Sequence, residues 1–291
     1  MDKPFKNIQE QVELLKSRGL TVEDADSAAE FLLYHNYYRV SGYSLTLRKD
    51  DVFYESATMQ NIIDIYEFDH ELRHILLKHL ETIEIKMKSV YSYEFAQMYS
   101  PYNYEDSSLF ADSDKHKEIM EKAERQKNLS LKNEAYLKHF SDTGQKMPIW
   151  AYVSLLTIAD ISLLYKISET ELKNKVAEDF FINTPNRADL LSRFMHSMTI
   201  VRNLCAHGSR LYNRIFQQKP GLKKSELSLL IKNDKNIVDN QHLYGFIFVM
   251  RRLLSKQDFS TLKSEIETLS KKYPFVNLKY YGFREDWKEV L

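Results

Sequence analysis

The amino-acid sequence predicts an all-α protein: a helical bundle with an N-terminal helical extension and a C-terminal helical elaboration. Apolar residues recur at three- and four-residue steps over long segments, which is the period of an amphipathic helix. Glycine is scarce, with seven in 291 residues, where average usage would give roughly 20. Few tight turns can therefore form, which disfavours a fold of many short strands. Several apolar segments also begin with a Ser, Thr or Pro signal for a helix start.

Residues 1–57 are expected to form the N-terminal helical extension. Its two short helices are expected over 7–17 and 22–35, and Thr21 is a suitable N-cap for the second. An aromatic-rich link, NYYRVSGY at 36–43, follows them. The extension is thus predicted to be helical and to lead into the main domain through this link.

The main domain, expected over 58–291, opens with the longest predicted helix. This helix runs from Thr58 to about Tyr99 without a proline or glycine, so it should be about 50–60 Å long at 1.5 Å per residue. Its apolar positions recur mostly at three- and four-residue steps. They are Ile62, Ile65, Tyr66, Leu72, Leu76, Leu80, Ile83, Met87, Val90 and Tyr91.

The later helices are expected from their start signals. Pro148 can occupy the first position of a helix over 149–166, and Ser168 with Glu171 has capping-box spacing for a helix to about Phe180. Thr184 followed by Pro185 should start a helix that runs to about residue 207. Further helices are expected over 114–128, 222–232, 241–256, 259–272 and 285–290.

The composition indicates a soluble cytoplasmic protein. Basic and acidic residues balance at 41 each, so there is no global bias toward nucleic acid or a membrane surface. A single cysteine cannot form an intramolecular disulfide, which fits a reducing compartment. The N-terminus has no apolar signal region. The longest apolar run, over 149–165, is broken by Asp160 and is shorter than the roughly 20 residues of a membrane span.

The stretch IVRNLCAHGSRLYNR, residues 200–214, carries the strongest candidate site. On a helical wheel Cys205 falls in the apolar stripe, so we expect a buried hydrophobe there and not a nucleophile. Residues five apart on a regular helix point about 140° away from each other, so Arg202 and His207 should not converge on one atom. Either Gly208 ends the helix and frees His207, or a second chain completes the site across a symmetric dimer.

Arginine and histidine together suit the cleavage of a phosphodiester in RNA. Histidine can move protons to and from the 2′-oxygen and the leaving 5′-oxygen, and a guanidinium can hold the phosphate. Asn203 lies on the same helix face as His207 and could orient the imidazole or the phosphate. No metal is needed. The spacing alone arises about once by chance, and the alternative is a basic helix end that interacts with the helix dipole.

A basic segment surrounds these residues, because residues 190–225 contain no Asp or Glu. Such a segment suits contacts to phosphates, and Tyr212 could stack on an unpaired base. The alternative is a solvated basic surface without a ligand. The basic residues are Arg193, Arg202, Arg210, Arg214, Lys219, Lys223 and Lys224, and the expected RNA contacts are Arg193, Arg210, Tyr212, Asn213 and Arg214.

A rival motif, HELRH at 70–74, matches the helix of zinc metallopeptidases. In that motif His70 and His74 would bind the metal and Glu71 would act as general base. The wheel places both histidines off the apolar face, and no third ligand stands out. We therefore expect surface histidines, with no metal and no cofactor.

Two carboxylates of the long helix are expected to support the site. Asp69 lies near the apolar face and Glu84 at its edge, and a buried carboxylate usually has a partner. The hypothesis is that one of them braces the Arg202 side chain.

These residues, taken together, resemble the Abi-like family of bacterial abortive-infection proteins, of the AbiD and AbiF type, which is similar to the HEPN superfamily of helical bundles. The segment after PIW departs from the family's pattern. The resemblance lies in NYYRVSGY at 36–43, FDHELRHILLKHLETIE at 68–84, PIW at 148–150, FMHSMTIVRNLCAHGSRLYNR at 194–214 and YYGFREDW at 280–287.

The resemblance implies a HEPN-like domain over 58–291 that cleaves RNA without a metal. The family's motif maps onto Arg202, Asn203 and His207, in a site made by two protomers that leaves a cyclic phosphate. It also implies a role in phage defence or toxin-like growth arrest, with a non-coding RNA or antitoxin as an expected partner. The alternative is a HEPN-like protein that binds RNA or regulates without catalysis. A zinc peptidase comes third.

Overall fold

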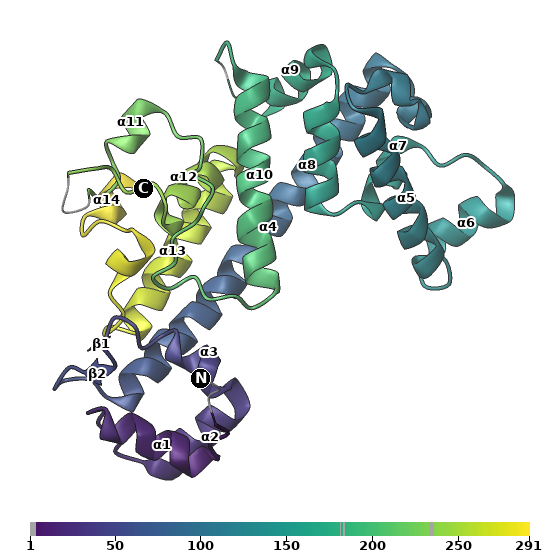
Figure 1. The fold of residues 1–291 in the computed structure, drawn as a ribbon. Helices are drawn as coiled ribbons and strands as arrows, with labels where there is room; N and C mark the ends of the chain where they lie inside the picture. Colours follow the sequence, from purple (N-terminus) through teal and green to yellow (C-terminus); the bar gives the residue numbers. More distant parts are fainter. Residues whose placement is uncertain (1–3, 181, 183, 233–235) are drawn as a thin grey trace.

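The computed structural model describes residues 4–180, 182, 184–232 and 236–291. In this part the chain is all-α, as expected, apart from one small antiparallel hairpin (Figure 1). The hairpin pairs β1 (Arg48–Lys49) with β2 (Val52–Phe53), and was not expected from the sequence. Its two turn residues, Asp50 and Asp51, both have positive φ angles, which Asp tolerates better than most residues.

Three helices make up the helical part of the N-terminal extension: α1 (Ile8–Ser17), α2 (Ala25–His35) and α3 (Tyr37–Ser41). The expected cap of α2 was wrong, because Asp24 accepts from the backbone of its first turn, whereas Thr21 forms a bridge to Thr58. Part of the aromatic link is helical, as α3. The division of the chain at residue 57 stays a prediction.

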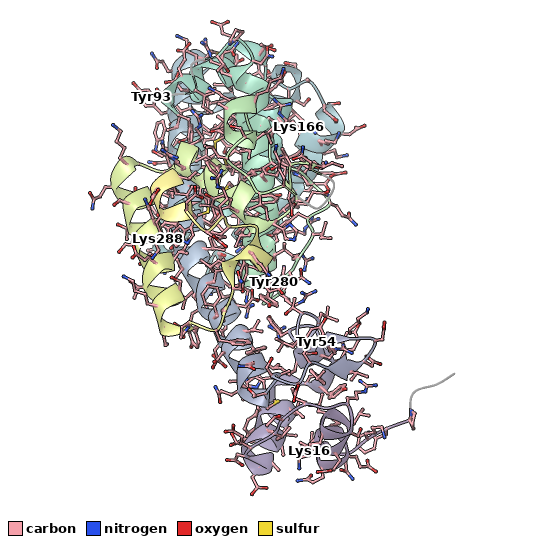
Figure 2. All side chains as sticks on the ribbon, turned by 90° about the vertical axis from the view of Figure 1, so that its left-hand side faces the viewer. Lys16, Tyr54, Tyr93, Lys166, Tyr280 and Lys288 are labelled. Carbon is pink, nitrogen blue, oxygen red and sulfur yellow. The ribbon has the colours of Figure 1, made fainter. Side chains whose placement is uncertain are left out.

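The long helix α4 (Met59–Met98) confirms the longest predicted element. Thr58 caps it in a capping box with Asn61. Its 40 residues span about 60 Å. In Figure 1 it crosses the molecule diagonally, from the N-terminal helices toward α8. Figure 2 shows the N-terminal helices as a lobe at one end, with Tyr54 in the lobe, Tyr280 at the nearest edge of the larger body, and Tyr93 at the opposite end.

The middle of the chain differs from expectation in one helix. The apolar segment predicted as one helix over 149–166 forms α7 (Ile149–Tyr152), a 3₁₀ turn η3 (Val153–Leu155) and α8 (Ile158–Ile167). The break arises because Thr157 starts a new helix in a capping box with Asp160. The other elements here are η1 (Asn103–Glu105), η2 (Ser107–Leu109), α5 (Ser113–Ser130) and α6 (Ala135–Thr143).

Two predicted helix starts are also corrected. The helix α9 (Thr170–Asp179) begins after Glu169, and the Ser168 hydroxyl bonds to Leu164 and Tyr91 instead of capping α9. The helix α10 (Arg187–Ala206) begins after Asn186, two residues beyond the expected first position. In both cases the helix exists and its cap lies elsewhere.

The C-terminal part of the chain adds five further elements, of which α12 and α13 pack against α4. They are α11 (Lys224–Leu227), α12 (Leu243–Leu253), α13 (Lys256–Lys272), η4 (Leu278–Tyr281) and α14 (Trp287–Val290). The helix expected over 222–232 is only a single turn. The helix α13 lies along α4, and α12 packs on both α10 and α13. No helix in the described residues has both the length and the apolar character to cross a membrane.

Candidate functional site

The C-terminal end of α10 forms the centre of the candidate site. The helix ends at Ala206, His207 is its C-cap, and Gly208 follows with a φ of 61°. The Ser209 N–H donates to the Leu204 carbonyl at 2.8 Å, and the Gly208 N–H donates to Cys205 at 3.0 Å. These two bonds define a Schellman motif. The expectation that Gly208 marks the helix end is therefore confirmed.

The three expected catalytic residues lie at this helix end. Arg202 and Asn203 are half-buried, and His207 is exposed. Arg202 Nη1 donates to Asn203 Oδ1 at 3.3 Å. Within the described part of the chain, the side chains of these residues have no other hydrogen bond or ion pair. Their polar groups are therefore available to a ligand.

Cys205 lies on the opposite, buried side of α10. Its side chain is 4% exposed. Burial, together with the Asp69 charge, raises the pKa of the Cys205 thiol to about 12. Cys205 is therefore part of the core, as expected. Only a thiolate is a strong nucleophile, so this thiol is not suited to nucleophilic attack.

Asp69 lies fully buried beneath the loop that follows α10. Its carboxylate is an ion-pair partner of Arg73 and accepts several further hydrogen bonds. Burial raises the pKa of Asp69, while Arg73 and the surrounding donors act in the opposite direction. The donors are the Tyr43 hydroxyl at 2.9 Å, the Tyr281 hydroxyl at 2.9 Å, and the backbone N–H groups of Leu211 at 3.1 Å and Tyr212 at 2.8 Å.

The hypothesis that Asp69 or Glu84 braces Arg202 was therefore wrong. Asp69 holds the loop after α10, because its donors lie in that loop and in the segments around it. Glu84 forms an ion pair with Lys88 at 2.8 Å, one turn away on α4. Neither carboxylate bonds to Arg202. Asp69 supports the candidate site through the backbone of Leu211 and Tyr212 instead.

Tyr212 does not offer a face to an RNA base, contrary to expectation. Its side chain is 2% exposed, its hydroxyl lies 2.7 Å from that of Thr46, and its ring packs against Tyr280 and Tyr281. Asn213 turns the chain with a φ of 48°, and its N–H donates to the Tyr280 carbonyl. Leu211, Tyr212 and Phe216 of this loop are all buried, so the loop packs into the core instead of lying on the surface.

The arginines of the basic segment divide into two groups. Arg193 is exposed on α10. Arg210 donates to the carbonyls of Tyr212 and Asn213, and Arg214 donates to the Arg210 carbonyl at 3.2 Å. Burial and the Arg210 charge lower the pKa of Arg214. Arg210 and Arg214 thus shape the loop, and their contacts to RNA stay a prediction.

Arg39, on α3, is a site residue that the sequence did not indicate. One of its Nη atoms donates to the Gly208 carbonyl, and its Nε donates to the Tyr66 hydroxyl at 3.2 Å. It therefore fixes the residue that follows His207. The available signal was its place in the block NYYRVSGY at 36–43, one of the segments that carry the resemblance described above.

The HELRH motif has a structural role between two helices. Glu71 accepts from Lys272 Nζ and from the Tyr273 hydroxyl, both at 2.7 Å, and so joins α4 to the end of α13. The rings of His70 and His74 lie 4.6 Å apart, with His70 half-buried and His74 exposed. Among the described residues, no group of three or more His, Cys, Asp or Glu side chains is placed to hold a metal ion.

The fold and the site together define a class: an all-helical protein with an arginine, an asparagine and a histidine presented at the capped end of an internal helix. A family model described as Abi-like protein matches residues 30–213, which is more than half of the chain and includes α3, Asp69 and the end of α10. The chain belongs to the Abi-like family. Membership indicates a role in abortive infection, a defence against phage. No curated protein and no solved structure matches the chain.

Proposed function

We propose that this protein is a metal-independent endoribonuclease of the HEPN type that acts in phage defence or in a toxin–antitoxin system. The observation that carries the proposal is a difference in hydrogen bonding between two groups of side chains near the end of α10. The side chains of Arg210, Tyr212 and Arg214 bond within the fold. In the described chain, those of Arg202, Asn203 and His207 bond to nothing outside their own group. Polar groups without a structural task, in a segment that contains no Asp or Glu, are suited to an anionic ligand.

The proposed reaction is attack of the RNA 2′-oxygen on the adjacent phosphorus. The imidazole of His207 accepts the 2′-hydroxyl proton or delivers a proton to the leaving 5′-oxygen. The O–P bond to the 5′-oxygen breaks as the 2′-oxygen bond forms, which leaves a 2′,3′-cyclic phosphate and a 5′-hydroxyl. Arg202 binds the phosphate oxygens through its paired N–H groups, and Asn203 orients Arg202 through its carbonyl oxygen.

A second protomer is part of the proposal. Since one histidine cannot serve as base and acid in the same step, two copies of His207 across a twofold axis would supply both roles. The exposed position of His207 at the helix end supports such an arrangement. The proposed partners are therefore substrate RNA, a second copy of the chain, and a non-coding RNA or antitoxin that controls activity.

One observation favours the alternative, a non-catalytic protein that binds or responds to RNA. In the described residues the His207 ring has no hydrogen-bond partner to fix its tautomer, whereas catalytic imidazoles are commonly oriented by a third group. In this alternative Arg202 and His207 contact RNA without transferring protons.

The test is cleavage of structured and unstructured RNA by the purified protein in excess chelator. The variants are His207→Ala, Arg202→Ala and the control His74→Ala, which removes an exposed histidine of the HELRH motif. We expect chelator-resistant cleavage by the wild type and His74→Ala, with cyclic-phosphate ends. We expect a loss of about 100-fold or more in His207→Ala, because general acid–base catalysis contributes at least that much.

Each other outcome has a distinct meaning. Equal cleavage by the wild type and His207→Ala would contradict the proposal. Binding of RNA without cleavage by any variant would support the non-catalytic alternative. Cleavage that is lost with chelator and in His74→Ala, but retained in His207→Ala, would restore the metal-dependent interpretation of HELRH.

A further inference from the structure

A cavity of about 390 Å³ lies between α3 and the loop that follows α10. It brings a segment of the N-terminal extension next to the end of the candidate catalytic helix. The sequence motifs gave no reason to expect it. It is lined by Tyr38, Arg39, Ser41, Gly42, Tyr43, Leu45 and Arg210.

Two guanidinium groups give this cavity its charge. An arginine has five N–H donors. Arg39 uses its Nε and one Nη for Tyr66 and Gly208, and Arg210 uses Nη1 for the loop carbonyls. In the described chain their remaining donors have no partner. The lining contains no carboxylate, and Asp69, which lies below, is fully buried. The cavity is therefore suited to an anion such as a phosphate group.

The aromatic ring of Tyr38 lines the same cavity. The Tyr38 side chain is 85% exposed and forms no hydrogen bond in the described chain. An exposed ring beside two arginines is the combination that binds unpaired bases and their phosphates. Tyr38 thus offers the stacking surface that the buried Tyr212 does not.

The cavity adjoins the candidate catalytic histidine through a direct bond. Arg39 donates to the carbonyl of Gly208, the residue after His207. A phosphate held by Arg39 and Arg210 would therefore be a near neighbour of a phosphate attacked beside His207. Two neighbouring phosphate positions fit a nucleic acid strand, which has a phosphate at every nucleotide, better than a single small anion.

We propose that this cavity is a nucleotide subsite for single-stranded RNA, in which Arg39 and Arg210 hold one phosphate and Tyr38 stacks on its unpaired base. The inference rests on the proposed function for the identity of its ligand. It extends that function by assigning substrate positioning to the N-terminal extension, and by making unpaired RNA the preferred substrate.

The test measures binding separately from cleavage. A short fluorescent oligouridylate with 2′-fluoro groups cannot be cleaved through its 2′-oxygen, and its affinity is read by fluorescence anisotropy. The variants are Tyr38→Ala, Tyr38→Phe and Arg39→Lys. The control is Tyr93→Ala, which removes an exposed tyrosine at the far end of α4 (Figure 2). The exposed Tyr38 side chain forms no hydrogen bond in the described chain, so we expect its replacement to leave the fold intact.

We expect Tyr38→Ala to weaken binding about 5- to 150-fold, the range for one stacked base. Tyr38→Phe should bind like the wild type, because it keeps the ring. Arg39→Lys should weaken binding, because lysine keeps the charge but lacks the paired N–H groups that hold a phosphate. A duplex of the same sequence should be affected little by Tyr38→Ala, because its bases are already stacked.

The proposal is overturned if Tyr38→Ala binds as tightly as Tyr93→Ala, or if Tyr38→Phe loses as much affinity as Tyr38→Ala. It is also overturned if an acidic peptide competes as well as RNA at equal charge. Failure of the protein to cleave RNA, with the Tyr38 effect on binding retained, would remove the proposed catalysis and leave the subsite standing. Cleavage that is lost in His207→Ala but unchanged in Tyr38→Ala would support the proposed catalysis and remove the subsite.

Discussion

The carboxylate of Asp69 accepts a 2.8 Å hydrogen bond from the backbone N–H of Tyr212, a residue 143 positions later in the chain. This bond fixes the loop that carries Arg210 and continues from His207. The same carboxylate pairs with Arg73 on α4. The geometry of the candidate site thus depends on a charge buried in the long helix, and not only on the residues exposed at the end of α10.

Replacement of Asp69 by Asn should destabilise the protein strongly. It leaves the 4%-exposed Arg73 as an uncompensated buried charge, which costs about 3 kcal/mol or more. The control is Glu84→Gln on the same helix, which breaks an ion pair one helical turn long whose side chains are 17–18% exposed, and which should cost about 0.5 kcal/mol. Urea unfolding of both variants measures the difference. Similar losses in the two would contradict the role assigned to Asp69.

Gly208→Ala should lower both stability and activity. A φ near +61° strains an alanine by about 1 kcal/mol, and the added Cβ would lie 3.4 Å from an Arg39 nitrogen. Gly144→Ala is the matched control, since Gly144 has a φ of 63° and open space around its Cα. Both variants should lose similar backbone stability in thermal unfolding. Only Gly208→Ala should slow RNA cleavage, by about tenfold or more.

Cys205 should not react with a thiol reagent in the native protein. Burial raises the pKa of its thiol to about 12, so almost no thiolate exists at pH 8. Because the chain has one cysteine, the reagent DTNB reports on this residue alone. We expect one thiol per chain to react in denaturant and a negligible rate without it. Rapid reaction of folded protein would show that the inner face of α10 is accessible.

The bonds between Glu71 and α13 should make stability depend on acid pH. Partial burial raises the pKa of Glu71, but Lys272 and Tyr273 lower it by more, so the folded value lies below the ordinary 4.5. A lowered carboxyl pKa stabilises the fold fully above the ordinary value, and this contribution is lost as the pH falls through the folded value. The difference in unfolding free energy between wild type and Glu71→Gln should therefore be constant above about pH 5.5 and shrink below about pH 4.

The same variant separates the two interpretations of the HELRH motif. Cleavage of RNA by Glu71→Gln at pH 7 should equal that of the wild type, because Glu71 joins helices and touches none of the candidate catalytic residues. A loss of activity without a loss of stability would argue that this glutamate acts in catalysis.

The elements that the sequence predicted well are those decided by local patterns. The three- and four-residue apolar steps placed α4 correctly, and Gly208 marked the end of α10, because only glycine adopts that backbone conformation readily. The split between α7 and α8 was missed because the mostly apolar composition of residues 149–166 favours one continuous helix. Thr157 and Asp160 lie inside this run and form the capping box that starts α8.

The site was predicted only in part, because its supports are distant in sequence. Nothing local to Asp69 indicates that it accepts from Tyr212 and Tyr281, and nothing local to Arg39 indicates its bond to Gly208. The surface position expected for Tyr212 was wrong for a related reason. A tyrosine in a basic segment suits RNA, but its burial is decided by Tyr280 and Tyr281, which follow some 70 residues later.

The hydrogen-bond partners of Asp69 are synthesised at different times during translation. A chain is synthesised from its N-terminus at about 5–20 residues per second, so Asp69 and Tyr43 leave the ribosome long before Tyr281, which donates the last of the hydroxyl bonds. The loop after α10 cannot acquire its full set of supports until residue 281 has been translated. For the proposed ribonuclease, the loop that follows His207 would gain the last of these supports only near the end of translation.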